Sequence, residues 1–310
     1  MPDRHADTAA VHAGKLVVPL NTASSPPLFQ SSSYEFADLA DVEEIYAGRR
    51  AGAVYGRYGG PNAVQFEAAL ADLEGAEAAV GSAAGMSAID AALRTNVRAG
   101  DGIVATSELY GGTYALLEEE YRKSGVRVVY VDQQDPAAVA AALERERPKI
   151  LYVEALTNPL VHVADLPGLA RAAHAAGALL VVDATFATPA TIRPLEHGAD
   201  LVVHSAGKYL GGHGDVGAGI LAGRKPLVEA ARSFLIRTGA TMPHFEAWLA
   251  LRGLRTLALR MERHSANAAF VAAALAREPG IASVSHPSFA AQPQHELAAL
   301  LYPHGTGGIL

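Results

Sequence analysis

The sequence predicts an α/β protein with a mostly parallel sheet that is flanked by helices on both faces. Short apolar runs alternate with segments of helical periodicity from about residue 63 to residue 223. The apolar runs are rich in Val, Ile and Leu and lack polar alternation, which is typical of parallel strands buried on both faces. Both observations favour strands that are connected through crossover helices.

The composition is that of a folded protein that acts on small molecules. The 310 residues are 50% hydrophobic and 18% charged, with a net charge of −7 and no basic run. This charge pattern argues against nucleic-acid partners and anionic membrane surfaces. No segment has the continuous apolarity of a membrane span, and the first seven residues lack an apolar signal core, so we expect a cytoplasmic protein. The chain has no cysteine, which excludes disulfides and thiolate chemistry.

The first part of the chain, residues 1–60, is expected to be an irregular arm. It contains Pro26–Pro27, Ser31–Ser33 and the start of Gly59–Pro61, and it shows little helical or strand periodicity. An irregular segment of this length is unusual in a compact domain unless it docks on something. We therefore expect the arm to contact a neighbouring subunit.

Residues 61–242 are expected to form the main α/β domain. The apolar spacing predicts a helix over Ala63–Glu74, and another helix begins near Gly85. The apolar runs predict strands at Ala76–Val80, Gly102–Thr106, Val126–Val131, Ile150–Glu154, Leu179–Asp183, Leu201–His204 and Gly217–Gly223.

Residues 243–310 are expected to begin a second, α+β domain that is incomplete. Pro243–Glu278 is Ala-rich and amphipathic and predicts mostly long helix. Ile281–His286 predicts a strand, Gln294–Leu301 a helix, and Gly307–Leu310 a strand that stops as it begins. Such an ending leaves an unpaired sheet edge, so a truncated chain is expected.

Lys208 and Asp183 are the strongest candidates for chemistry. Asp183 ends one apolar strand, and Lys208 lies in a turn of small residues just after the next strand. In open α/β sheets the ligand crevice lies at the carboxyl ends of the strands, so both side chains should face it. A lysine that can form an imine and a carboxylate that can hold a pyridinium nitrogen are what pyridoxal 5′-phosphate (PLP) requires. The alternatives are a solvated surface lysine and an aspartate that caps a turn.

Other residues suit the phosphate and the ring of such a cofactor. Gly85 and Met86 open a helix after a strand, where free amides and the helix dipole favour a phosphate, although small residues are also used there for steric reasons. Tyr110 opens a later helix and could stack on a flat ring with its hydroxyl free for proton transfer, or be an ordinary turn residue. Arg57, in the Tyr55–Arg57 stretch of the arm, suits a phosphate but could equally be a solvated charge.

His204 and His213 are the two histidines close to Lys208. They lie on turn residues without the spacing of a zinc site, so a hydrogen-bonded structural role is expected and no metal is predicted.

Motifs in the right order along nearly the whole chain resemble the Cys/Met-metabolism family of PLP-dependent transsulfuration enzymes. This family includes cystathionine γ-synthase, cystathionine γ-lyase, methionine γ-lyase and O-acetylhomoserine sulfhydrylase. The matching segments are Val11–Gly14, Tyr55–Arg57, Gly85–Met86, Tyr110–Thr113, Glu154–Pro159, Asp183–Pro189, His204–Lys208, Trp248–Thr256 and Arg260–His264.

The resemblance implies an aspartate-aminotransferase-like fold (fold type I) and a homotetramer built from tight dimers. Lys208 would bind the cofactor as an imine and then move protons between substrate carbons, Asp183 would pair with the pyridine nitrogen, and Tyr110 would stack on the ring and act as an acid or base. The resemblance also implies which residues hold the phosphate: the amides of Gly85 and Met86, the side chain of Ser205, and Tyr55 and Arg57 of a neighbouring subunit. Asn158 and Thr185 would line the rest of the cofactor.

Three departures from the family pattern stand out. Gly207 occupies a position where the family commonly has threonine, which removes one hydroxyl contact to the phosphate. Ala184 replaces a common asparagine. The family also continues past a strand like Gly307–Leu310, and that continuation holds the arginine that binds the substrate carboxylate.

The expected function is γ-replacement or γ-elimination on a small amino-acid substrate, either a sulfur amino acid or an O-activated homoserine. The alternative is a truncated, non-catalytic remnant that binds PLP or joins an oligomer. A nucleotide-dependent oxidoreductase is a distant third, because no Gly-x-Gly-x-x-Gly turn opens a helix after an early strand.

Overall fold

A seven-stranded sheet forms the centre of the computed structural model, which describes residue 8 and residues 23–310. The strands lie in the order β1-β7-β6-β5-β4-β2-β3. β7 runs antiparallel to both of its neighbours, β1 and β6, and the other neighbouring pairs are parallel. The mostly parallel sheet predicted from the sequence is therefore confirmed. The strands are β1 Ala78–Ser82, β2 Gly102–Thr106, β3 Arg127–Val131, β4 Ile150–Glu154, β5 Leu179–Asp183, β6 Leu201–Ser205 and β7 Gly219–Gly223.

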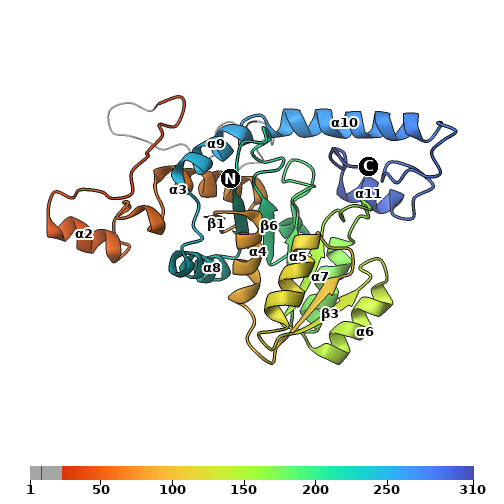
Figure 1. Ribbon diagram of the computed structural model, residues 1–310, viewed down its shortest axis with the longest axis horizontal. Coiled ribbons are helices and arrows are strands. Elements are labelled where there is room, and N and C mark those ends of the chain that lie inside the picture. Colours follow the sequence, from red (N-terminus) through yellow and green to blue (C-terminus); the bar gives the residue numbers. More distant parts are fainter. Residues whose placement is uncertain (1–7, 9–22) are drawn as a thin grey trace.

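Helices cover both faces of this sheet, and two of them extend along one side of the molecule (Figure 1). The α-helices are α2 Leu39–Tyr46, α3 Pro61–Glu74, α4 Gly85–Arg94, α5 Gly111–Leu116, α6 Pro136–Glu146, α7 Leu166–Ala175, α8 Lys225–Thr238, α9 His244–Leu254, α10 Leu257–Leu275 and α11 His295–Leu301. Short helical turns lie at Gly56–Tyr58 and Pro194–His197, and a π-helical segment, Leu117–Tyr121, continues α5. No helix within residues 23–310 is both long and apolar enough to cross a bilayer.

The strands form because their side chains are buried on both faces. Every residue of β2, β4 and β7 is buried. On one face the sheet packs against α4 and α8, and on the other against α6 and α7, where Leu301 of α11 also joins the core. At about 25 cal/mol per Å² of buried apolar surface, this double coverage is the main favourable contribution to folding.

Local signals set the beginnings of two helices on the second face. The Asp135 side chain accepts hydrogen bonds from the amides of Ala137 and Ala138 and so caps α6. Asp165 caps α7 in the same way through the amide of Gly168. Each cap satisfies amides that have no partner within the helix, which is worth about 1 kcal/mol.

The arm predicted over residues 1–60 contains one helix that the sequence did not reveal. Residues 1–7 and 9–22, with the Val11–Gly14 motif, lie outside the described residues. Within the rest of the arm, α2 begins where Asp38 accepts a hydrogen bond from the amide of Asp41. No α2 residue is buried, and its eight residues are fewer than the window over which helical periodicity can be recognised in a sequence.

The two strands predicted near the C-terminus are wrong. Residues 281–286 and 307–310 adopt no strand, and no other described strand lies beside them to complete a ladder. Instead, the Ser285 hydroxyl donates to the carbonyl of Leu160. The apolar residues of both segments suggested strands, but a strand forms only where a partner edge is available.

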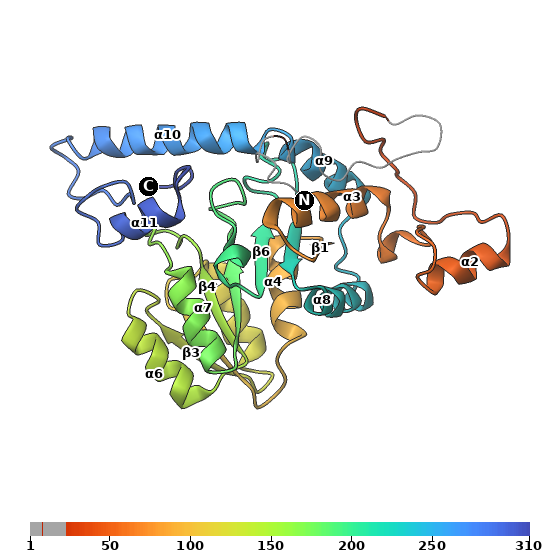
Figure 2. The same ribbon diagram turned by 180° about the vertical axis from the view of Figure 1, so that it is seen from behind.

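The long helix predicted over residues 243–278 is divided into α9 and α10 (Figure 2). Gly253 lies so close to the carbonyl of Gly211 that a side chain there would collide with it. The Gly253 carbonyl, at the end of α9, accepts a hydrogen bond of 3.2 Å from the amide of Thr256 and one of 2.8 Å from the Arg260 guanidinium. These contacts satisfy the carbonyl where the chain turns, so the break costs little hydrogen bonding.

Candidate active site at the carboxyl edge of the sheet

Asp183 ends β5, and its carboxylate lies at the carboxyl edge of the parallel strands. Its Oδ1 accepts a 2.9 Å hydrogen bond from the amide of Thr185, and its Oδ2 accepts a 3.2 Å bond from the Tyr152 hydroxyl. Burial raises the pKa of Asp183, and the bonds from Thr185 oppose the shift. A carboxylate in such surroundings is stabilised by a cation, which the pair of neutral donors does not supply.

Glu154 ends the neighbouring strand β4 and faces Asp183 in register. The residue is 3% exposed. Its Oε1 accepts the amide of Tyr110 at 2.7 Å, and its Oε2 accepts the amide of Asn158 at 3.0 Å. Burial, together with the charge of Asp183, raises the pKa of Glu154 to about 8. Glu154 thus joins the loops that carry two predicted cofactor residues, Tyr110 and Asn158.

The sequence analysis did not name Glu154 as a site residue, although it placed it in a family motif. A carboxylate that ends a buried strand next to the Asp183 strand was the available signal. The two amides that donate to its carboxylate belong to different segments of the chain, so no local pattern reveals these contacts.

Glu154→Gln is expected to flatten the pH dependence of stability of the cofactor-free chain. The pKa of Glu154 is about 8 in the folded chain and near its ordinary value when unfolded. Between these pH values the folded state holds a proton that the unfolded state has released, so raising the pH favours unfolding. The difference in the free energy of unfolding between the variant and the unaltered chain should therefore be about 2–4 kcal/mol more in favour of the variant at about pH 8 than at about pH 5.

Urea unfolding of the two chains at both pH values measures this difference. Glu119→Gln, an exposed control, should leave the pH dependence as it is in the unaltered chain. The assignment is wrong if Glu154→Gln and the unaltered chain lose stability in parallel as the pH rises.

Thr185, Ser205 and Gly85 meet beside Asp183. The Thr185 hydroxyl accepts a 2.9 Å hydrogen bond from the amide of Ser205 at the end of β6. Gly85, the first residue of α4, packs directly against Ser205, because a Cβ atom built on Gly85 would lie 2.7 Å from the Ser205 Cβ. The amides of Gly85 and Met86 are in the first turn of α4, where helix geometry provides no acceptor for them. These amides and the Ser205 hydroxyl form a cradle that suits a phosphate.

Gly85→Ala is expected to weaken PLP binding by about 10-fold or more, because the added methyl group displaces Ser205 from the cradle. Gly111→Ala is a matched control, since Gly111 also begins a helix and a Cβ there meets nothing within 4 Å. Fluorescence titration of the dialysed chains with PLP measures both affinities. Equal affinities for the two variants would contradict the role of Gly85.

Lys208 lies three residues after Ser205, in the turn that follows β6. Its amide donates to the Ser205 carbonyl at 3.0 Å, and its carbonyl accepts the amide of Gly212 at 2.8 Å. The Lys208 side chain is exposed. Because β5 and β6 are adjacent parallel strands, Lys208 and Asp183 emerge at the same edge of the sheet, as predicted.

Gly207 has a steric role in this turn. A Cβ atom at this position would collide with the carbonyl of Val216. The threonine common in the family therefore does not fit here unless the Val216 segment moves.

Tyr110 lies at the start of α5 with half of its surface exposed. A Cβ built on Gly112 would lie 2.5 Å from the Tyr110 ring and 3.2 Å from the Met86 sulfur. The Tyr110 ring therefore lies near the beginning of α4, beside the cradle. It has an open face on which a flat ligand can stack.

Tyr55 and Arg57 are not brought to this group within the chain. The Arg57 guanidinium donates a 2.7 Å hydrogen bond to the carbonyl of Ile236 in α8 and lies 4.9 Å from the centre of the Tyr58 ring. Both Tyr55 and Arg57 are exposed. Their assignment to a neighbouring subunit's cofactor stays a prediction.

The histidines near Lys208 make hydrogen bonds within the chain. His204 Nε2 lies 2.7 Å from Glu74 Oε1 in a fully buried pair, and His213 Nδ1 bonds the carbonyl of Gly211 at 2.8 Å. Among the described residues, no group of three or more His, Asp or Glu side chains has the arrangement of a metal site.

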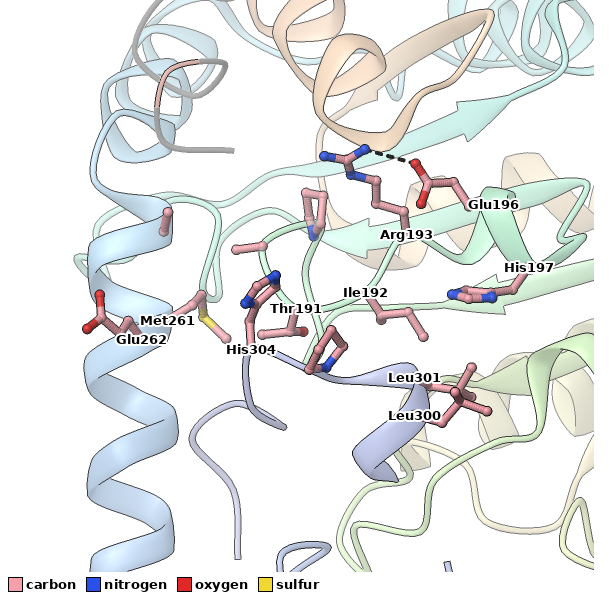
Figure 3. A pocket seen from close by; sticks show the side chains of 14 residues that line it. Thr191, Ile192, Arg193, Glu196, His197, Met261, Glu262, Leu300, Leu301 and His304 are labelled. Atoms are coloured by element: carbon pink, nitrogen blue, oxygen red, sulfur yellow. Dashed lines mark hydrogen bonds and ion pairs between the residues drawn. The ribbon is translucent and has the colours of Figure 1, made fainter. Parts of the chain in front are cut away.

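A hollow of about 810 Å³ lies beside the site, between α10, α11 and residues 189–197 (Figure 3). Met261 of α10 and His304, just after α11, contribute to its walls, and an ion pair of 2.8 Å joins Arg193 to Glu196 on the sheet side. None of its lining residues is a predicted cofactor residue, so the hollow is separate from the cradle.

The fold and the site together define a PLP-dependent enzyme of fold type I. A mostly parallel sheet carries the partly buried Asp183 carboxylate, a lysine after the next strand and a helix N-terminus at one edge. Comparison with known families agrees: the family described as Cys/Met metabolism PLP-dependent enzyme matches residues 7–310. The chain belongs to this family.

Individual members of the family are similar to this chain over most of its length. The chain is 42% identical over 292 residues to an O-succinylhomoserine sulfhydrylase of Pseudomonas aeruginosa, covering 94% of this chain and 72% of the relative. It is 41% identical to an L-methionine gamma-lyase of Pseudomonas putida, covering 94% and 73%. A crystal structure of cystathionine gamma synthase from Xanthomonas oryzae pv. oryzae, in complex with aminoacrylate and cysteine, superposes with a TM-score of 0.91 at 36% identity, covering 99% and 77%.

Proposed function

We propose that the chain catalyses γ-replacement or γ-elimination on an O-activated homoserine or a sulfur amino acid, with PLP bound at Lys208. The observation that carries the proposal is the partly buried Asp183 carboxylate, whose pKa is raised by desolvation and which lies at the same edge of the sheet as Lys208. A protonated pyridine nitrogen is the cation that this carboxylate lacks.

The residues at the edge of the sheet fit PLP. The first amides of α4 and the Ser205 hydroxyl match the phosphate, because the packing of Gly85 on Ser205 leaves no side chain between them. Tyr110 offers a ring face, and Thr185 and Asn158 lie on the turns that follow β5 and β4. The cofactor, when bound, supplies an electron sink that stabilises negative charge on carbon atoms of the substrate.

The proton transfers fall to residues of the chain. Lys208 Nζ is the base that removes the Cα proton of the substrate and returns a proton to a neighbouring carbon. When the cofactor is bound, the Asp183 carboxylate would accept a hydrogen bond from the protonated ring nitrogen and hold that proton in place. The Tyr110 hydroxyl is the second group able to donate or accept a proton, and Glu154 fixes its backbone through the Tyr110 amide.

The choice of the γ position follows from the relatives. The sulfhydrylase and the γ-lyase are named for replacement and elimination, and their identities to this chain, 42% and 41%, are nearly equal. Both reactions need a leaving group on Cγ and a base that moves protons between Cα and Cβ. The proposal therefore includes both outcomes.

The proposal also includes a homotetramer in the cytoplasm, in which Tyr55 and Arg57 serve the cofactor of a neighbouring subunit. Two features support the sharing of residues between subunits. Both side chains are exposed, and the Arg57 guanidinium donates to the Ile236 carbonyl in α8 and not to a residue of its own chain's cradle.

Product analysis tests the function. The PLP-loaded chain is incubated with O-succinylhomoserine, with and without sulfide, and separately with methionine. Elimination releases a 2-oxo acid and ammonia, and replacement by sulfide releases homocysteine and succinate. Either product, formed by the unaltered chain and not by Lys208→Ala, supports the proposal. A chain that holds PLP yet forms neither product would instead match the non-catalytic alternative.

A further inference from the structure

A second hollow lies at the edge of the sheet opposite the active site. It measures about 810 Å³, and its cationic lining residues come from four separate places in the chain. Arg94 ends α4, Arg98 lies between α4 and β2, Lys149 directly precedes β4, and Arg237 is in the last turn of α8. We call this hollow the basic pocket. Because β2 and β4 start beside it, it lies at the amino edge of the parallel strands.

The basic pocket concentrates positive charge in an acidic protein. The whole chain has a net charge of −7, yet the pocket is lined by four cationic side chains and one carboxylate, that of Asp101. The Asp101 carboxylate accepts a 2.8 Å hydrogen bond from the amide of Arg98. The single negative charge of Asp101, whose carboxylate already accepts this turn hydrogen bond, does not neutralise the four positive charges.

Three of the four cations have no carboxylate within ion-pair distance among residues 8 and 23–310. Arg94 has local partners, since it lies 3.5 Å from Asp90 and 4.3 Å from the centre of the Tyr121 ring. Arg98, Lys149 and Arg237 form no such pair, whereas arginines near them, such as Arg127 and Arg224, do.

Helix dipoles explain only part of this arrangement. α4 and α8 pack side by side, and positive charge near the C-terminal end of a helix offsets its partial negative charge (Figures 1 and 2). This accounts for Arg94 and Arg237, which lie at the ends of these helices. Arg98 and Lys149 belong to neither helix, yet they line the same hollow.

We propose that the basic pocket binds a small multivalent anion of the phosphate class. Guanidinium groups offer several donors to phosphate oxygens, and Lys149 adds a point charge. Ser233 and Phe234 of α8 also line the pocket. The ten residues of α4 connect this pocket, over about 15 Å, to the cradle at Gly85.

Calorimetric titration with inorganic pyrophosphate tests the proposal on the PLP-loaded, dialysed protein. The double variant Arg98→Gln/Lys149→Gln removes two of the cations that lack a partner. Arg171→Gln/Arg277→Gln removes the same charge from exposed positions outside the pocket and is the matched control. The pocket variant is expected to bind at least about fivefold more weakly than the unaltered chain, and the control variant about as well as the unaltered chain.

Raising KCl from about 0.05 M to about 0.5 M should weaken binding to the unaltered chain, because the attraction is electrostatic. Thermal unfolding, followed by circular dichroism, verifies that both double variants are folded. The proposal is overturned if the unaltered chain does not bind pyrophosphate at low salt. It is equally overturned if both double variants bind as the unaltered chain does, since the anion then binds elsewhere, such as in the cradle.

Discussion

Asp183→Asn is expected to lower kcat/KM by about 10²–10³-fold while leaving the fold intact. Asparagine keeps the shape of the side chain but carries no charge to hold a proton on the pyridine nitrogen. The same change removes a partly buried carboxylate whose pKa is raised by desolvation. The cofactor-free variant should therefore be at least as stable as the unaltered chain near pH 8, where ionised Asp183 is unfavourable in the folded state.

Lower activity together with undiminished stability separates a chemical role of Asp183 from a structural one. Steady-state kinetics with saturating PLP and urea unfolding without PLP measure the two quantities. Asp165→Asn is the matched control, because Asp165 is not a predicted cofactor residue, its side chain caps α7, and asparagine is an equally good cap. Unchanged kcat/KM in Asp183→Asn would exclude Asp183 as the partner of the ring nitrogen.

Lys208→Ala is expected to reduce turnover by at least about 10³-fold, because one side chain both attaches the cofactor and moves the substrate protons. The imine-type visible absorbance should also disappear from the dialysed protein. Lys208 is exposed and its side chain makes no hydrogen bond within the described part of the chain, so its removal should leave the unfolding midpoint nearly unchanged.

Lys123→Ala is the control for the loss of a lysine. Lys123, just after the π-helical segment, forms an exposed ion pair with Glu119, and such pairs contribute little to stability. Its absorbance and turnover should match those of the unaltered chain. Retention of the absorbance band by Lys208→Ala would assign the cofactor to another lysine.

The sequence predicts that Asp183 and Lys208 lie at one edge of the sheet, because their positions depend on local features. Each follows an apolar run, and neighbouring parallel strands end at one edge of the sheet. The hydrogen bonds of Glu154 depend on loops that are distant in sequence and meet only in the fold, so periodicity does not reveal them. The contact between Arg57 and Ile236 spans 179 residues and is equally hidden.

The direction and pairing of strands were harder to predict than their existence. The run that forms β7 looks like the other apolar runs, yet it lies antiparallel between β1 and β6. β1 is also displaced by two residues from its predicted start at Ala76, because its register with β7 sets its bounds. Apolar character near Ile281 suggested a further strand, but residues 281–286 pair with no strand of the described chain.

Borohydride reduction followed by peptide mass spectrometry tests the central claim most directly. The purified chain is incubated with PLP, reduced, dialysed and digested, and the peptide that carries the pyridoxyl phosphate group is sequenced. The chain has five lysines, Lys15, Lys123, Lys149, Lys208 and Lys225, and we expect the label on Lys208 alone. A label on another lysine, or no label after reduction, would contradict a cofactor site formed by Asp183, the cradle at Gly85 and Lys208.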